Sequence, residues 1–173
     1  VILGISLVFE PKEPGLMDRP PRPVSAPLLD RTLLTRVLVV STLMATAAFG
    51  FFELAQAQGL TIEQCRTITV NTIVVIEVAY LFACRSLRLP VWRIGLFTNK
   101  WVWLGSIVML FAQLAFTYAP FMQRLFHTAD LAPIWWVRLM AAGVLVFAVV
   151  EAKKLVGRRT PIQPPDLAAK SQS

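Results

Sequence analysis

Charged residues are scarce in this sequence. Only 16% of its 173 residues are Asp, Glu, Lys or Arg, while 56% are hydrophobic. Soluble domains carry about 25% charged residues, and a chain this short cannot bury so much apolar surface within itself. The composition therefore excludes an ordinary soluble domain. It also excludes the basic nucleic-acid binder that the net charge of +7 would otherwise suggest.

Cysteine and histidine are nearly absent. We expect Cys65 and Cys84 near opposite ends of one helix, about 28 Å apart, which is too far for a disulfide. The single histidine, His127, has no metal-ligand partner at a useful spacing, so we expect it on the surface. No Gly-rich phosphate loop, nucleophile elbow or zinc motif is present. We therefore expect no catalytic activity and no cofactor in this chain alone.

Apolar runs take up most of the chain instead. Each is long enough to cross a hydrocarbon layer as a helix, or nearly so, and tryptophan and tyrosine gather at the ends of the later runs, as they do at membrane interfaces. The sequence therefore predicts an all-α fold, a polytopic transmembrane helix bundle. Its four complete spans are predicted at residues 33–52, 67–84, 101–118 and 135–150.

The chain begins with a shorter apolar run. As a helix, residues 1–9 would reach only about 14 Å, against a hydrocarbon core of about 30 Å. No basic segment or small-residue cleavage site marks a signal peptide. We therefore expect the second half of a truncated transmembrane helix, followed by a four-helix domain over 33–157. Residues 158–173 are predicted to be a basic, disordered tail.

Polar connectors separate the runs. Residues 10–32 hold six prolines, which forbid a long helix and favour a stiff, extended loop. The segment 53–66 is predicted to be a polar turn, ending where Thr61 and Gln64 fit a capping box for the next helix. The segments 85–100 and 119–134 are predicted to be further loops.

The basic residues indicate the orientation. Of the 17 Lys and Arg residues, only Arg66, Arg124 and Arg138 fall on one predicted side of the membrane. All the others lie in or beside residues 10–32, residues 85–100 or the tail. Because loops rich in Lys and Arg stay in the cytoplasm, we expect these three segments to be cytoplasmic in a multi-pass protein of the cell membrane.

Glu77 is the residue most indicative of function. It lies near the middle of the second span, where an acidic side chain costs about 2.5–3.5 kcal/mol on insertion scales. A carboxylate is the oxygen ligand that calcium or a similar cation prefers. The alternative is a protonated Glu77 bonded to a neighbouring helix. Tyr80 and Cys84 share its helix face, and we expect them to pack rather than bind.

Other polar residues in the spans predict contacts between helices. We expect Asn71 and Gln113 to form hydrogen bonds to neighbouring helices. Glu151 stands at the end of the fourth span, and we expect it to be either solvated or paired with Lys154 or Arg36.

The proline-rich connector carries a family resemblance. It runs from Phe9-Glu10-Pro11 through the stretch MDRPPR at residues 17–22 to Ala26-Pro27-Leu28-Leu29. This resembles the loop between the sixth and seventh transmembrane helices of calcium-pump-like P-type ATPases. The loop style and the lack of a signal indicate a bacterial source.

The resemblance, which covers residues 1 to about 157, implies a function. The four spans would be the seventh to tenth helices of a cation pump, and Glu77 matches an acidic residue of the eighth helix that helps bind transported calcium. Asp18 and Arg19 would belong to the loop that couples the phosphorylation domain to the membrane. ATP and Mg²⁺ would act only in the full-length pump, whose N-terminal helices and phosphorylation domain, with the lipid bilayer and the cation, would be the partners. The alternative is a self-standing four-helix carrier or assembly protein.

Overall fold

The computed structural model describes residues 2–11, 31–85, 95 and 97–157, and all regular structure within them is helical. The elements follow one another as α1 (Ile2–Ser6), η1 (Leu7–Phe9), α2 (Arg31–Ala57), α3 (Ile62–Cys84), α5 (Lys100–Tyr118), α6 (Pro120–Phe126) and α7 (Pro133–Gly157). Most of the predicted connector 10–32 and the whole tail 158–173 lie outside the described residues, as do Asp18 and Arg19.

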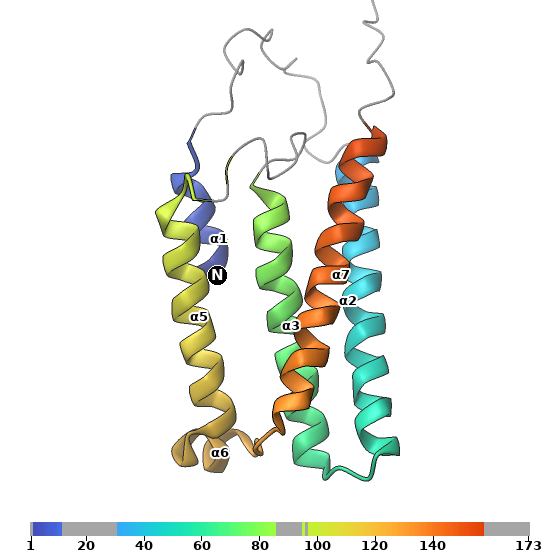
Figure 1. The fold of residues 1–173 in the computed structure, drawn as a ribbon, viewed down its shortest axis with the longest axis vertical. Helices are drawn as coiled ribbons and strands as arrows, with labels where there is room; N and C mark the ends of the chain where they lie inside the picture. Colours follow the sequence, from blue (N-terminus) through green and yellow to red (C-terminus); the bar gives the residue numbers. More distant parts are fainter. Residues whose placement is uncertain (1, 12–30, 86–94, 96, 158–173) are drawn as a thin grey trace, which may run out of the picture.

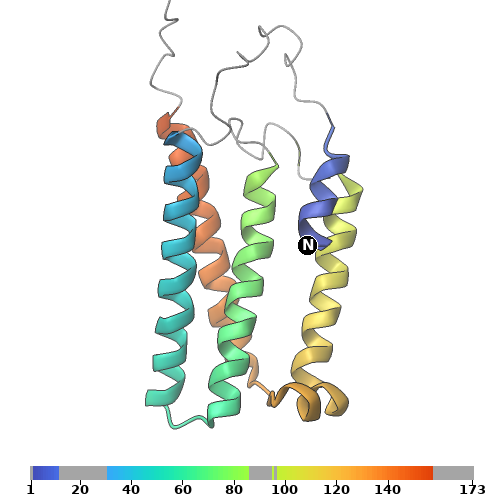
Figure 2. The ribbon, with the colours of Figure 1, turned by 180° about the vertical axis from the view of Figure 1, so that it is seen from behind.

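Four helices, α2, α3, α5 and α7, are long and apolar enough to cross a membrane. They lie side by side and alternate in direction (Figures 1 and 2), so that successive connections fall at opposite ends of the bundle. The predicted all-α, multi-pass membrane fold is therefore confirmed. We call the end that holds the C-termini of α3 and α7 and the N-termini of α2 and α5 the basic end.

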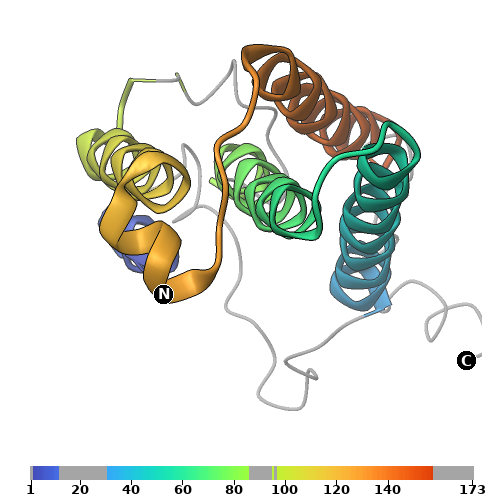
Figure 3. The same cartoon turned by 90° about the horizontal axis from the view of Figure 1, so that it is seen from below.

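Helix α3 occupies the centre of the bundle. Seen along the helix axes, α2 and α7 lie on one side of α3 and α5 with the short α1 on the other (Figure 3). The tightest packing is between α3 and α7. A Cβ placed on Gly143 of α7 would lie only 2.8 Å from Cγ1 of Val75 on α3, so this glycine allows the two helices their close approach.

The turn between α2 and α3 is shorter than predicted. Helix α2 continues past Glu53 to Ala57, and α3 begins at Ile62, which leaves four residues in place of the predicted 53–66. One acidic residue at the edge of an apolar run does not end a helix, whereas Gly59 does. Gly59 has a φ of 76°, a conformation that glycine adopts without steric cost.

The predicted capping box at the start of α3 is confirmed. The backbone N–H of Gln64 donates to the hydroxyl of Thr61 at 3.3 Å, and the backbone N–H of Thr61 donates to Oε1 of Gln64 at 3.1 Å. Two backbone donors that the first helical turn leaves unpaired are thereby satisfied.

The predicted loop 119–134 contains a short helix, and this part of the prediction was wrong. Helix α6 starts at Pro120, whose fixed φ suits a first helical position. It ends at Phe126, and its C-cap residue His127 has a φ of 52° and is exposed, as predicted. Helix α7 then extends to Gly157, beyond the predicted end of the fourth span at residue 150, because amphipathic basic residues can continue a helix at an interface.

Candidate functional site

Helix α3 packs against different helices on its two sides. Ile76 and Ala83 are buried against α2 and α7 in one apolar cluster. On the other side, Leu81 is buried with Leu3 of α1 and Val102 of α5. The two cysteines, Cys65 and Cys84, are free thiols near opposite ends of this helix, as predicted.

Glu77 lies on the wall of a cleft between α3 and α1. The cleft has a volume of about 470 Å³ and is lined by Leu3, Gly4, Leu7, Glu77, Tyr80, Leu81, Cys84 and Met109. The carboxylate is exposed, and no hydrogen bond or ion pair joins it to another described residue. The interhelical hydrogen bond that was the alternative for Glu77 is therefore not formed within the described part of the chain.

The cleft offers a cation only part of a coordination shell. Its polar side chains are the carboxylate of Glu77, the hydroxyl of Tyr80 and the thiol of Cys84. Over residues 2–11, 31–85 and 97–157, no three His, Cys, Asp or Glu side chains come close enough to hold a metal ion. Since calcium takes 6–8 oxygen ligands, Glu77 can supply one carboxylate and the remaining ligands must come from elsewhere.

A polar seam joins α3 to α5 on the other side of Glu77 from the basic end. Asn71 donates from Nδ2 to the hydroxyl of Thr117 at 3.1 Å, and both side chains are fully buried. The predicted interhelical bond of Asn71 is confirmed. Gln113 is buried one turn away on α5, but its Nε2 has no hydrogen-bond partner in the described structure, so the bond predicted for this amide group is not formed.

Glu151 is buried, and its predicted pairing with Lys154 is observed. Oε1 of Glu151 lies 2.5 Å from Nζ of Lys154, and the same ammonium donates to the main-chain oxygen of Ala83 at 2.6 Å. The pair therefore joins α7 to the last turn of α3 at the basic end.

A second charged cluster at the basic end was not predicted from the sequence. Glu10, Arg85 and Asn99 come from three different segments and meet between α1, α3 and α5. Glu10 and Arg85 were placed only in polar loops. The one local signal was an Asn in front of an apolar run, which is a favoured helix N-cap.

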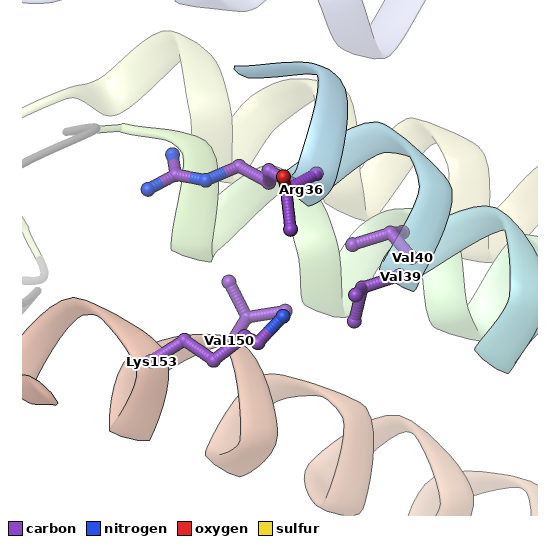
Figure 4. A pocket seen from close by; sticks show the side chains of 6 residues that line it. Arg36, Val39, Val40, Val150 and Lys153 are labelled. Carbon is purple, nitrogen blue, oxygen red and sulfur yellow. The ribbon is translucent and has the colours of Figure 1, made fainter. Parts of the chain in front are cut away.

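A groove separates α2 from α7 at the same end of the bundle. Figure 4 shows Val39 and Val40 of α2 across from Val150 and Lys153 of α7. The groove has a volume of about 250 Å³, and Thr35 and Arg36 complete its lining. It lies on the side of α3 that faces away from the cleft of Glu77, so the two are separate features.

The sequence is similar to cation-transporting ATPases along nearly its whole length. It is 42% identical over 165 residues to the "Probable cation-transporting ATPase F" of Mycobacterium tuberculosis, a match that covers 95% of this chain and 18% of the relative. It is 30% identical over 151 residues to the "Calcium-transporting ATPase type 2C member 2" of Mus musculus, which covers 87% of this chain and 16% of the relative.

A cyanobacterial relative is also similar to this chain over most of its length. The "Cation-transporting ATPase pma1" of Synechocystis is 29% identical over 169 residues, covering 93% of this chain and 18% of the relative. This chain thus spans less than a fifth of the length of these relatives. The family described as the cation transporting ATPase C-terminus matches residues 1–156. The chain is a bundle of membrane-spanning helices with an acidic residue on a cleft, and the family model covers most of its length. It therefore belongs to the C-terminal domains of cation-transporting ATPases.

Proposed function

We propose that this chain is the C-terminal membrane domain of an ATP-driven pump for calcium or a similar cation, and that Glu77 is one of the ligands of the transported ion. The full-length pump would use ATP and Mg²⁺ and pass through a phospho-aspartate intermediate. This chain would support the ion-carrying helices and hold part of the coupling loop. Its partners would be the N-terminal helices and the phosphorylation domain of the same pump.

The observation that carries this proposal is the position of Glu77. An acidic side chain in the middle of a membrane helix is costly unless it faces a polar path or partner. In this structure the carboxylate faces the cleft beside α1 and has no cationic partner among the described side chains. A transported cation would supply the missing positive charge. The mouse relative, a calcium-transporting ATPase, supports calcium as that cation.

The membrane orientation follows from the charges. Arg36, Arg85, Lys100, Lys153 and Lys154 all lie at the basic end of the helices. Loops rich in Lys and Arg remain on the cytoplasmic side. We therefore place the basic end, with residues 10–32, 85–100 and the C-terminal tail, in the cytoplasm of a multi-pass protein of the cell membrane. The family assignment favours this pump over a self-standing four-helix carrier or assembly protein.

The test is a comparison of two carboxylate substitutions in the full-length pump, reconstituted in lipid vesicles. Glu77→Gln keeps the size of the side chain but removes its charge. We expect it to raise the Ca²⁺ concentration that gives half-maximal phosphorylation from ATP about tenfold or more, because a charged oxygen ligand is lost. Glu63→Gln is the matched control, since Glu63 lies in the first turn of the same helix and does not line the cleft.

The two outcomes are distinct. Unchanged Ca²⁺ dependence in Glu77→Gln, with normal yield of folded pump, would reduce Glu77 to a packing role and remove the ligand assignment. An equal change in the Ca²⁺ dependence of Glu63→Gln would show that any carboxylate on α3 has this effect through long-range electrostatics. A panel of Ca²⁺, Mn²⁺ and other divalent cations in the same assay identifies the transported ion.

A further inference from the structure

The charged cluster at the basic end begins with Glu10, the residue that follows η1. Its carboxylate accepts hydrogen bonds from Arg85, the C-cap residue of α3, at 3.1 and 3.2 Å from Nε and at 2.8 Å from Nη2. The Arg85 side chain is fully buried and that of Glu10 is 14% exposed. A buried guanidinium that holds a carboxylate through two nitrogens is among the strongest and most directional links between side chains.

Asn99 adds a third segment to this cluster. Its Oδ1 accepts from the backbone N–H groups of Trp101 and Val102 and so caps the start of α5. Its Nδ2 donates to Oε2 of Glu10 at 2.8 Å and to the main-chain oxygen of Ser6 at 3.2 Å. One buried amide therefore fixes the first turn of α5 and attaches it to the end of α1.

The remaining donors of Arg85 form hydrogen bonds to residues that precede α5. Nη1 donates to the main-chain oxygen of Gly95 at 3.0 Å, and Nη2 donates to the hydroxyl of Thr98 at 2.5 Å. Arg85 is thus bonded on both sides, to α1 through Glu10 and to the residues that precede α5. A guanidinium with partners on both sides leaves its helix little freedom to slide against either neighbour.

Apolar contacts fix α1 to α5 as well. The rings of Phe9 and Trp101 stack with their centroids 4.9 Å apart. Further along, a Cβ on Gly105 would come within 3.6 Å of Cβ of Ser6, so the two helices are close there. These contacts join α1 to α5 but not to α3. The polar link from α1 to α3 at this end runs through Glu10 and Arg85.

The cluster also stands at one end of the cleft of Glu77. Leu7 and Cys84 line that cleft, and the cluster follows directly in the chain, with Glu10 three residues after Leu7 and Arg85 next to Cys84. Arg85 is eight residues beyond Glu77, which is about 12 Å along a helix. The separation of α1 from α3 at this end therefore determines the width of the cleft beside Glu77.

We propose that Glu10, Arg85 and Asn99 are positioning residues for cation binding, which hold α1 against α3 and so set the distance between the walls of the cleft. This rests on the proposed function, in which Glu77 binds the transported cation. Ligands have to stay within about 0.5 Å of their working geometry. A buried, bidentate pair at the end of the cleft holds its walls at one separation.

The first experiment measures Ca²⁺ binding in the reconstituted full-length pump. Glu10→Gln keeps the shape of the side chain but removes the charge that holds Arg85. We expect the Ca²⁺ concentration for half-maximal phosphorylation to rise about fivefold, a usual size for a coupling residue. The control is Glu151→Gln, because Glu151 is also a buried, ion-paired carboxylate at the basic end but belongs to α7, on the other side of α3 from α1. Glu151→Gln should leave the Ca²⁺ dependence unchanged.

The second experiment tests the packing of α1 against α3 by disulfide cross-linking, and its result does not depend on the role of Glu77. In a pump with Cys65 and Cys84 replaced by Ser, cysteines are introduced as Leu7→Cys and Leu81→Cys, on opposite walls of the cleft. We expect Glu10→Gln to lower the rate of their disulfide cross-linking about threefold or more, as a wider and looser α1–α3 pair should. A role confined to overall stability would lower the yield of folded pump but not the cross-linking rate of the folded fraction.

The outcomes separate the two proposals. If Glu77→Gln leaves Ca²⁺ dependence unchanged while Glu10→Gln slows cross-linking, the ligand assignment fails and the positioning of α1 stands. If Glu10→Gln changes neither Ca²⁺ dependence nor cross-linking in folded pump, the positioning role is overturned. Should Glu10→Gln not fold, Asn99→Ser gives the same test, because a serine hydroxyl still caps α5 but cannot reach Glu10 as the Asn99 amide does.

Discussion

Lys154 of α7 caps a helix to which it does not belong. Its ammonium donates to the main-chain oxygen of Ala83 in the last turn of α3 and lies 2.5 Å from the carboxylate of Glu151. The C-terminus of a helix leaves carbonyl oxygens unpaired and carries partial negative charge. A buried cation there satisfies one of them. It ties the two most closely packed helices of the bundle at the basic end, where the chain leaves the membrane.

Removal of Lys154 should therefore destabilise the domain strongly. Lys154→Met removes the ammonium group that pairs with the buried carboxylate of Glu151, and breaking a buried ion pair in this way costs about 3–5 kcal/mol. The double variant Lys154→Met, Glu151→Leu removes both charges and should recover most of that loss. Denaturation of the purified protein in mixed micelles measures both. Equal loss in the single and the double variant would show that the Ala83 cap, and not the charge pair, carries the stability.

The bond between Asn71 and Thr117 predicts a small, specific effect. Thr117→Val keeps the shape of the side chain but removes the hydroxyl that Asn71 bonds. Interhelical hydrogen bonds in membranes contribute about 0.6 kcal/mol on average, so a loss of that size is expected in the same denaturation assay. Thr69→Val is the control, because the Thr69 hydroxyl donates only to Cys65 of its own helix. A loss as large in the control would contradict an interhelical role.

Two glycines should differ in their sensitivity to the same substitution. Gly143→Ala places a methyl group 2.8 Å from the stiff side chain of Val75, and overpacking of this kind costs about 1–3 kcal/mol. Gly50→Ala meets nothing within 4 Å, so we expect no loss of stability. The melting temperatures of the two variants provide the comparison, and a tolerated Gly143→Ala would mean that α3 and α7 separate easily.

The coupling role proposed for the proline-rich connector gives a prediction about turnover. Charge reversal at Asp18 or Arg19 should slow ATP hydrolysis by the full-length pump about tenfold, because a proline-stiffened loop would carry a contact with the phosphorylation domain. The Ca²⁺ concentration for half-maximal activity should stay nearly the same. Charge reversal at Lys170, in the tail, is the control for a general effect of charge. Wild-type turnover in Asp18→Lys and Arg19→Glu would remove the coupling role.

The sequence predicted the spans because their signal is local. Twenty apolar residues in succession mean a membrane helix whatever their neighbours do. Helix ends were less accurate, as at Glu53 and Pro120, because hydropathy falls at the membrane edge while backbone hydrogen bonding continues. The capping box at Thr61 was predictable for the opposite reason, since all its partners lie within four residues.

The partners of buried polar groups could not be predicted in the same way. Glu151 and Lys154 are three residues apart, so their pairing was foreseeable, but the second acceptor of Lys154 is the main-chain oxygen of Ala83, 71 residues away in the chain. Glu10 and Arg85 are separated by 75 residues. The helices are apolar all round, so no periodic pattern shows which face meets which neighbour. Only the packed structure identifies the side of α3 that carries Glu77.

The tight turn at Gly59 bears on the order in which the domain assembles. Helices α2 and α3 are joined by four residues, so their mutual contacts are local in sequence and form quickly. Because chains emerge from the ribosome N-terminus first, this hairpin is complete before α5 and α7 have been synthesised. The hydrogen bond between Asn71 and Thr117 can form only after α5 has been synthesised, and the bond between Lys154 and Ala83 only after α7. Mutations in the turn should therefore impair biogenesis, while mutations at the late contacts should act on a hairpin that has already been inserted.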